Sequence, residues 1–281
     1  MITDRATRRR WPAHGAAALA VLLLAAPFRA QAPESVFQPR IGQPGKDVIW
    51  VPTPPTLVEK MLDLVEVTEG DTLVDLGSGD GRLVIAAARR GARAVGIEFN
   101  HDMVELSRQR AAREGLADRV RFIAGDLFAQ DLSEATIVTM FLLPEINLAL
   151  RERLLRLKPG TRLVSNTFDM GAWVPDTIAA VGGDCVVWCT ALLWVVPAEV
   201  GGTWQSPQGT LALRQEFQLV SGTLTQGSAA VPLEAGRLLG DRLTLHAGAV
   251  DFVGRVGGDI IEGTATSSGA TVAWVARRVA R

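Results

Sequence analysis

Three glycines at alternate positions, Gly77, Gly79 and Gly81, constrain the fold of this chain more than any other feature. They follow an apolar strand pattern at 72–76 and precede a helical pattern that begins near Arg82. Glycines let the backbone turn sharply and approach a ligand without obstruction by a Cβ, and the first turn of a helix offers unpaired N–H groups. The stretch therefore predicts a nucleotide-binding loop between the first strand and helix of a doubly wound α/β domain.

Carboxylates distinguish this loop from the dinucleotide-binding fingerprint G-x-G-x-x-G, which holds a pyrophosphate at a helix N-terminus. The spacing here is G-x-G-x-G, with Asp75 two residues before the first glycine and with Ser78 and Asp80 inside the loop. A carboxylate beside the loop suits an amino group or a sulfonium better than it suits two phosphates. We therefore expect S-adenosylmethionine, held by Asp75, Ser78, Asp80 and the three glycines.

Two further acidic residues stand where successive strands are predicted to end. Glu98 closes the second strand pattern, about 20 residues after the glycines, which is the usual spacing for a carboxylate that accepts the ribose hydroxyls. Asp126 follows the third strand pattern and, with Leu127 beside it, is placed to meet the adenine. The carboxyl ends of parallel strands meet along one crevice, so we expect these acids together. The alternative is that Asp126 only caps a turn and Glu98 is a surface charge.

The pattern around the loop extends over six segments: 51–54, 58–62, 75–82, 94–98, 138–143 and 157–165. Together they resemble class I methyltransferases. More specifically, they resemble the archaeal broad-specificity protein lysine methyltransferases and the mitochondrial enzymes that act on the c-subunit of ATP synthase. The resemblance covers about Trp50 to Trp173. It implies S-adenosylmethionine as cofactor, contacts to that cofactor from Thr53 and Pro54, and a lysine amine as methyl acceptor.

The predicted acceptor side lies where the fourth strand pattern ends. Phe141, Leu142 and Pro144 would line an apolar channel there, with Asn147 nearby as an orienting group. Methyl transfer from a sulfonium is an in-line displacement that depends on positioning more than on a strong base, and desolvation favours the neutral form of an amine. Phe141 departs from the family, in which we expect Tyr, and the chain contains no Tyr. The alternative places Phe141 in the core.

The function classes that remain open are an enzyme and a binding protein. The enzyme would methylate a protein lysine or a small molecule; the alternative is an exported S-adenosylmethionine-binding protein without turnover. Residues 33–281 hold 24 basic and 29 acidic residues, a net charge of −5. Because phosphate binding requires a basic face, we do not expect a nucleic-acid partner. We expect no metal site, since the two cysteines have no cluster of His, Asp or Glu around them. The sequence does not set the oligomeric state.

The remaining periodicity predicts a doubly wound, mostly parallel sheet. Strands are expected at 73–76, 94–97, 120–124, 136–142 and 162–166, with closing strands at 185–188 and 191–196. Helices are expected at 54–65, 83–90, 102–114 and 144–157. On the strand at 185–188, Cys185 and Cys189 would lie about 13 Å apart at about 3.3 Å per residue, too far for a disulfide. We therefore expect both cysteines to be buried small apolar residues.

Beyond Pro197 the pattern changes to short alternating segments separated by glycines. Gly-Asp pairs recur at 240–241 and 258–259, and such turns between strands predict an antiparallel meander that closes into a small β-barrel or sandwich. Trp204 and Trp274 are expected to fill its core. The predicted organisation is a signal peptide or anchor at 1–32, a linker at 33–49, the methyltransferase domain at 50–198 and a small all-β domain at 199–281.

The first 32 residues resemble an export signal. A basic region with Arg8 and Arg9 precedes an apolar stretch at 16–26, and small residues at 30–32 fit a cleavage site. The apolar stretch is too short to span a bilayer comfortably. The paired arginines resemble a twin-arginine signal. We therefore expect an exported protein, periplasmic or tethered to the membrane, and a cytoplasmic one if the segment is not a true signal.

Overall fold

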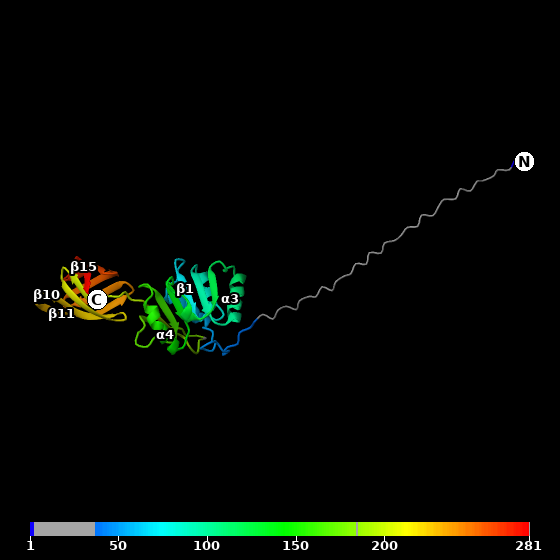
Figure 1. Cartoon of the computed structure of the whole chain (residues 1–281), viewed down its shortest axis with the longest axis horizontal. Helices are drawn as coiled ribbons and strands as arrows, with labels where there is room; N and C mark the ends of the chain where they lie inside the picture. The colour runs from blue at the N-terminus through cyan, green and yellow to red at the C-terminus, as the bar shows by residue number, and fades with distance from the viewer. Residues whose placement is uncertain (3–36, 184, 281) are drawn as a thin grey trace. The chain divides into compact units, whose positions relative to one another are not determined.

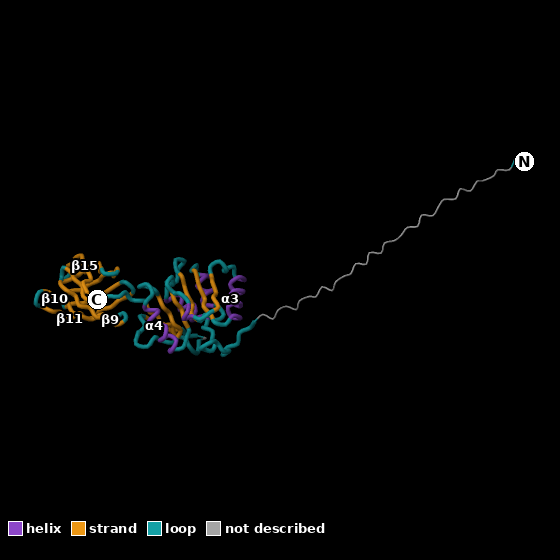
Figure 2. The backbone as a smooth tube through the Cα atoms, in the orientation of Figure 1, coloured by secondary structure: helices purple, strands orange, loops and turns teal. Residues whose placement is uncertain are grey.

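The computed structural model of the chain describes residues 1–2, 37–183 and 185–280 (Figure 1). Nearly all of the predicted export signal lies outside these residues. Every described helix and strand belongs to the unit Phe37–Arg281. That unit contains a seven-stranded sheet flanked by helices and a closed barrel of eight strands. Figure 2 colours the strands orange and the helices purple.

The sheet has the strand order β3-β2-β1-β4-β5-β7-β6. The first five strands in this order pair in parallel, and β7 pairs antiparallel with both β5 and β6. The strands are β1 (Thr72–Leu76), β2 (Arg93–Glu98), β3 (Val120–Ala124), β4 (Ile137–Met140), β5 (Arg162–Asn166), β6 (Thr177–Ala180) and β7 (Thr190–Val195). The helices are α1 (Pro55–Leu64), α2 (Arg82–Arg89), α3 (His101–Arg113) and α4 (Pro144–Leu155), with a 3-10 turn η1 (Leu127–Ala129). The predicted doubly wound fold is confirmed.

Alternating side chains of the strands build a core on each face of the sheet. Leu73 belongs to the cluster that includes α1 and α2, whereas the next residue, Val74, belongs to the cluster that includes α4. This is the period-two alternation of a strand that is covered on both faces. With its helices packed on both faces, the sheet leaves the carboxyl ends of its strands free to carry a site.

The closing strand predicted at 185–188 is wrong, and so is the expectation of unbridged cysteines. Cys185 and Cys189 form a disulfide with their Cα atoms 5.8 Å apart, which an extended strand could not bring together. The outer strand is instead β6, and the cysteines close a turn between β6 and β7. The run Val186-Val187-Trp188 has the composition of a strand, but the covalent closure overrides that propensity.

The carboxyl-terminal part is an antiparallel barrel, one of the two predicted forms. Its strands are β8 (Gly202–Ser206), β9 (Gly209–Glu216), β10 (Leu219–Gln226), β11 (Ala229–Leu239), β12 (Arg242–Ala247), β13 (Val250–Gly257), β14 (Ile260–Ser267) and β15 (Ala270–Ala280). Each strand pairs with the next, and β15 pairs with β8 to close the barrel. Trp204 and Trp274 are fully buried, as predicted, together with Phe252. The two Gly-Asp pairs form hairpin turns in which the glycines have positive φ.

The barrel contacts the sheet domain through its β9–β10 turn and through Arg237 on β11. Phe217 in that turn stacks on Trp173, with ring centroids 6.0 Å apart, and the side chain of Gln218 donates to the carbonyl of Val174 at 2.7 Å. Arg237 forms an ion pair with Asp176 at 2.5 Å. These partners all lie between β5 and β6, so the barrel packs against the segment that connects those two strands.

Candidate functional site

The glycine loop joins β1 to α2 and is shaped by close contacts. The N–H groups of Gly77 and Ser78 both donate to the carbonyl of Ile97 at 2.9 Å, which ties the loop to β2. Gly79 has a φ of +52°, and a Cβ there would lie 2.5 Å from the indole Nε1 of Trp50. Gly81 has a φ of +76°, and its Cβ would also clash with neighbouring side chains. The loop therefore needs glycine for both conformation and space.

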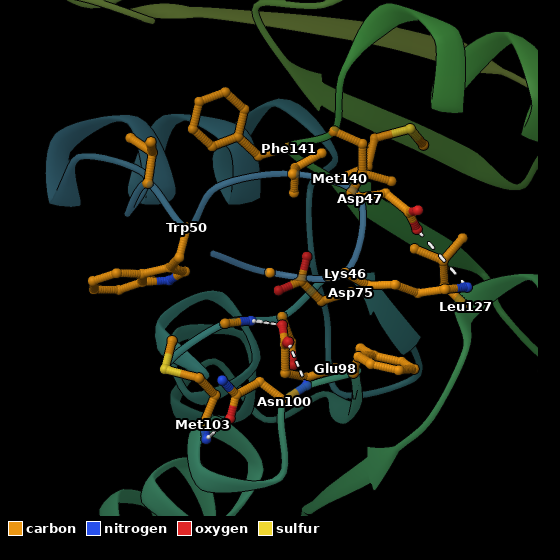
Figure 3. A pocket seen from close by; sticks show the side chains of 18 of the residues that line it. Lys46, Asp47, Trp50, Asp75, Glu98, Asn100, Met103, Leu127, Met140 and Phe141 are labelled. Atoms are coloured by element: carbon orange, nitrogen blue, oxygen red, sulfur yellow. Dashed lines mark hydrogen bonds and ion pairs between the residues drawn. The ribbon is translucent and has the colours of Figure 1, made fainter. Parts of the chain in front are cut away.

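A cavity of about 440 Å³ lies above this loop, at the carboxyl ends of the central strands (Figure 3). Its volume is within the usual range for a cofactor site. The sequence-predicted residues that line it are Thr53, Asp75, Gly77, Ser78, Gly79, Asp80, Glu98, Asp126, Leu127, Phe141 and Leu142. Four others, Pro54, Gly81, Pro144 and Asn147, are not among the lining residues. Pro54 precedes α1, Gly81 is the cap of α2, and Pro144 opens α4.

Glu98 is held at the end of β2 by two backbone donors. Its Oε2 accepts from the N–H of Gly79 and its Oε1 from the N–H of Asn100, both at 2.9 Å. The side chain of Asn100 in turn caps α3 by accepting from the backbone of Asp102 at 2.9 Å and of Met103 at 3.2 Å. Each carboxylate oxygen can accept a further hydrogen bond, so Glu98 in this position can still accept hydrogen bonds from two hydroxyl groups.

Asp75 is the buried carboxyl of the cavity. The hydroxyl of Thr139 donates to its Oδ1 at 2.6 Å. The pKa of Asp75 is raised to about 7, mainly by burial and also by the nearby charges of Glu98 and Asp80, which together outweigh the lowering effect of the Thr139 hydrogen bond. A cationic group brought beside Asp75 would favour its ionised form, so this position fits the amino group of a bound amino-acid moiety.

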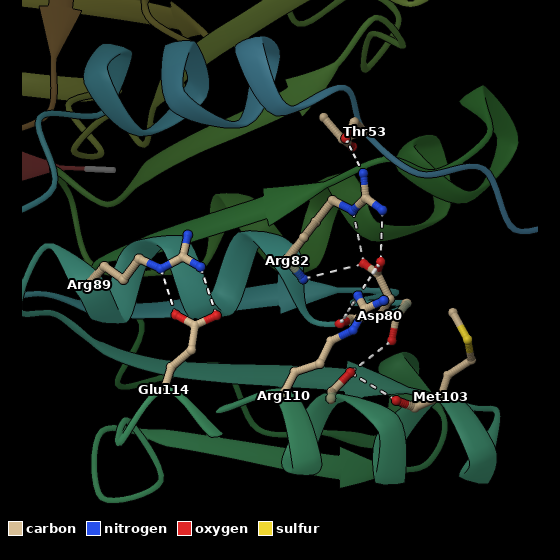
Figure 4. Close-up of polar contacts among 9 residues, drawn as sticks. Thr53, Asp80, Arg82, Arg89, Met103, Arg110 and Glu114 are labelled. Atoms are coloured by element: carbon tan, nitrogen blue, oxygen red, sulfur yellow. Dashed lines mark hydrogen bonds and ion pairs between the residues drawn. The ribbon is translucent and has the colours of Figure 1, made fainter. Parts of the chain in front are cut away.

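Asp80 serves a different purpose from the one predicted from the sequence (Figure 4). Arg82 and Arg110 bind its carboxylate at 2.7 and 2.5 Å. Burial would raise the pKa of Asp80, but the two guanidinium groups outweigh burial and lower it. Arg82 also donates to the carbonyl of Thr53 at 2.8 Å. Asp80 thus ties the loop to α3 and, through Arg82, to the segment before α1, and Asp75 is the carboxylate left for a cationic group.

The predicted linker contributes a wall of the cavity that sequence reasoning missed. Residues 43–50, which we call the strap, fold back on themselves: the N–H of Trp50 donates to the carbonyl of Gln43 at 2.9 Å. All eight strap residues line the cavity. The strap has neither helical nor strand periodicity, and its one sequence signal is the aromatic Trp50 just ahead of the proline-rich run at 52–55.

An ion pair attaches the strap to the predicted adenine side. Lys46 Nζ lies 2.7 Å from Asp126 Oδ2 and 5.5 Å from the centroid of the Phe99 ring. The Lys46 hydrogen bond lowers the pKa of Asp126, and Asp126 also caps η1 by accepting from the N–H of Phe128 at 2.9 Å. Asp126 therefore caps a turn, which was the alternative considered from the sequence, and it also lines the cavity.

Three aromatic rings form the wall at the end of β4. Phe141 lies between Phe168, with ring centroids 6.0 Å apart, and Trp188, with centroids 5.8 Å apart. All three residues line the cavity, and Phe141 is not in the core. Phe168 follows β5 and Trp188 lies in the turn closed by the disulfide, so neither could be placed beside Phe141 from sequence periodicity.

Asn147 supports this wall from behind. It is fully buried on α4, and its amide donates to the carbonyls of Phe168 and Asp169 at 3.1 and 3.3 Å. Its Oδ1 is buried without a hydrogen-bond partner among the described residues. Asn147 therefore positions the turn that carries Phe168 and does not face the cavity, in contrast to the predicted orienting role.

Two other properties of the described residues bear on the site. Across the described ranges, no group of three or more His, Cys, Asp or Glu could hold a metal ion. Of the helices in the part of the chain that the structure describes, none is long and apolar enough to span a membrane.

Comparison with known proteins relates this geometry to methyl transfer. The model of the ANTKMT methyltransferase domain matches residues 75–177. A protein-lysine N-methyltransferase of Saccharolobus islandicus (strain REY15A) is 40% identical over 137 residues, which cover 48% of this chain and 85% of that protein. The ATP synthase c-subunit lysine N-methyltransferase of Homo sapiens is 35% identical over 173 residues, which cover 61% of this chain and 70% of that protein.

A solved methyltransferase structure also matches this chain. It is an RNA methyltransferase from Salinibacter ruber in complex with S-adenosyl-L-homocysteine, and it is 51% identical. The match covers 53% of this chain and 96% of that one, with a TM-score of 0.50. A cavity with a glycine cradle, a carboxylate held in place at the end of β2 and a buried acid fits S-adenosylmethionine in residue chemistry as well as in volume.

Proposed function

The chain belongs to the family of S-adenosylmethionine-dependent protein-lysine N-methyltransferases, and from this membership we propose that it methylates the ε-amine of a lysine in a protein substrate. The observation that carries the proposal is the aromatic wall of Phe141, Phe168 and Trp188 next to the cofactor cradle. An apolar wall suits a nucleophile that desolvation can neutralise. An alcohol or a carbon acid would need a base to abstract its proton.

When bound, S-adenosylmethionine would supply the methyl group, and in-line attack of an amine on the methyl carbon would break its bond to sulfur and leave S-adenosylhomocysteine. The chain's own residues position the reactants. Glu98 and Asp75 fix the cofactor end of the cavity, and Asn147 holds the turn of Phe168. A lysine amine packed against the apolar rings of the aromatic wall would lose part of its hydration, which lowers the pKa of the amine from its reference value of about 10.4 and favours the neutral nucleophile. The same ring faces attract the methylated ammonium product through cation–π interaction.

The nature of the acceptor is tested by label transfer. Tritiated S-adenosylmethionine and the purified protein are incubated with membrane and soluble extracts of the source cells. We expect the label in a protease-sensitive, nuclease-resistant fraction that yields methyl-lysine on hydrolysis. Label in nuclease-sensitive material would favour RNA, the class named for the Salinibacter ruber enzyme, and label in a dialysable product would favour a small molecule. Either result would contradict the lysine proposal.

We also propose that the protein works in an oxidising compartment after export. The signal-like pattern at 1–32 supports this, and so does the Cys185–Cys189 disulfide, because disulfides persist mainly outside the reducing cytosol. A reporter fused after Gln43 should be exported, and replacing Arg8 and Arg9 by Lys should block a twin-arginine route. Recovery of the unmutated fusion in the membrane fraction would indicate a tether, and its retention in the cytoplasm would contradict export.

A further inference from the structure

The disulfide between Cys185 and Cys189 closes a five-residue ring between β6 and β7. Val186 and Val187 in this ring are 88% and 54% exposed. Trp188 is less exposed, at 38%, and differs from them because its ring contacts Phe141 edge-on and it lines the cavity. One residue of the ring is thus directed to the acceptor wall, and two are directed to solvent.

Besides its contact with Phe141, Trp188 is held in this place through its neighbour Cys189, which the disulfide joins to Cys185 and whose carbonyl accepts from the N–H of Val181 at 2.9 Å. The φ of Trp188 is +56°, a left-handed conformation that a bulky residue rarely adopts. The adjoining outer strand β6 is mostly exposed, and among the described strands β7 alone pairs with it. A short covalent ring removes much of the conformational freedom that an open loop of this composition would have.

We propose that Trp188 is a positioning residue for the methyl acceptor and that the Cys185–Cys189 disulfide holds it in the acceptor wall. Opening the ring then weakens acceptor binding and leaves the cofactor cradle intact, since Glu98 and Asp75 lie on other elements. The inference rests on the proposed function in that it takes the Phe141 side of the cavity as the acceptor side.

Reduction of the ring is a defined two-electron step. The Sγ–Sγ bond breaks, the two sulfurs gain two electrons and two protons, and both cysteines become thiols. In the experiment dithiothreitol supplies the electrons and protons and is itself oxidised to its cyclic disulfide.

The test compares four forms of the full chain: the oxidised protein, the reduced protein, the double variant Cys185→Ser/Cys189→Ser, and Trp188→Ala. The rate of tritium transfer from S-adenosylmethionine is measured with increasing amounts of the extract fraction that accepts the label, taken from unlabelled extract. The affinity for S-adenosylhomocysteine is measured by calorimetry. Trp188→Phe, which keeps an aromatic ring, serves as the conservative variant. Reduction of the Trp188→Ala variant is the matched control, because this variant has no indole for the disulfide-closed loop to position.

Reduction, the double variant and Trp188→Ala should each raise the half-saturating acceptor concentration about tenfold, the order expected for loss of an aromatic contact to a desolvated amine. Affinity for S-adenosylhomocysteine should change less than twofold, and Trp188→Phe should recover most of the acceptor affinity. Reduction should have no further effect on Trp188→Ala. If the double variant does not fold, the reduced protein carries the comparison.

Two results would overturn the inference. One is an unchanged half-saturating concentration after reduction, and the other is an equal effect of reduction on Trp188→Ala and on the unmodified chain. The class of molecule that carries the label is determined separately from these half-saturating concentrations. Label on RNA or on a small molecule would therefore refute the lysine proposal without deciding the role of Trp188.

Discussion

At the scale of single residues, Glu98 is the side chain on which we expect cofactor affinity to depend most. It accepts from two backbone N–H groups and faces the cavity with its remaining acceptor capacity. Glu98→Ala should weaken S-adenosylhomocysteine binding by about 1.5 to 3 kcal/mol through lost charge-assisted hydrogen bonds. Calorimetry measures this change. Glu105→Ala, an exposed glutamate on α3, is the control, and equal affinity in the two variants would remove Glu98 from the site.

Asp75 should make cofactor binding dependent on pH. Its pKa is raised from 3.8 to about 7, mainly by burial, so the free protein holds a proton there at lower pH that a cationic ligand group would displace. Affinity for S-adenosylhomocysteine should therefore rise as the pH increases from 6 to about 8, with proton release on binding. Calorimetry in buffers of different ionisation enthalpy detects the proton. Asp75→Asn should bind without this proton release, and release that persists in the variant would assign it to another group.

At the scale of elements, the strap is the part that we expect to control cofactor exchange. The Lys46–Asp126 ion pair fastens it, and both side chains are 37% exposed. Because exposed ion pairs contribute little and are screened by salt, Lys46→Ala should speed S-adenosylhomocysteine dissociation only about two- to fivefold at low ionic strength, and less at high salt. Stopped-flow fluorescence measures the rate. Lys158→Ala, which removes an exposed pair with Glu134, should leave the rate unchanged.

The elements also show what local sequence can and cannot predict. β1 to β5 and their helices have clear periodicity, and the acids at their ends follow from the parallel order, so about a third of the residues that line the cavity could be predicted from sequence. The strap and the turn of Phe168 have no periodicity, because their positions depend on distant partners such as Asp126 and Asn147. Trp188 was misplaced for a related reason, since a disulfide that local propensity does not encode replaced the expected strand by a turn.

At the scale of the whole molecule, the contact between barrel and sheet should contribute to stability. Phe217 is partly buried against Trp173, with the Arg151 guanidinium 5.5 Å from its ring centroid. Phe217→Ala should lower the free energy of unfolding by about 2 kcal/mol, less than for a fully buried ring. Denaturant unfolding measures the loss. Leu219→Ala, at an exposed position two residues along, should change it little. Equal stability of the two variants would show that the stack contributes nothing.

The closure of the barrel has a consequence for assembly during synthesis. Seven of its eight strand pairs join strands that follow one another, whereas β15 returns to β8, where Arg278 pairs with Trp204 and stacks over its ring at 4.2 Å. Until β15 has formed, β8 and β14 each present an unpaired edge, and such edges accept strands from other molecules. At high concentration, β15 of one molecule can complete the barrel of another, so exchange of this last strand is the route by which two copies would become entangled.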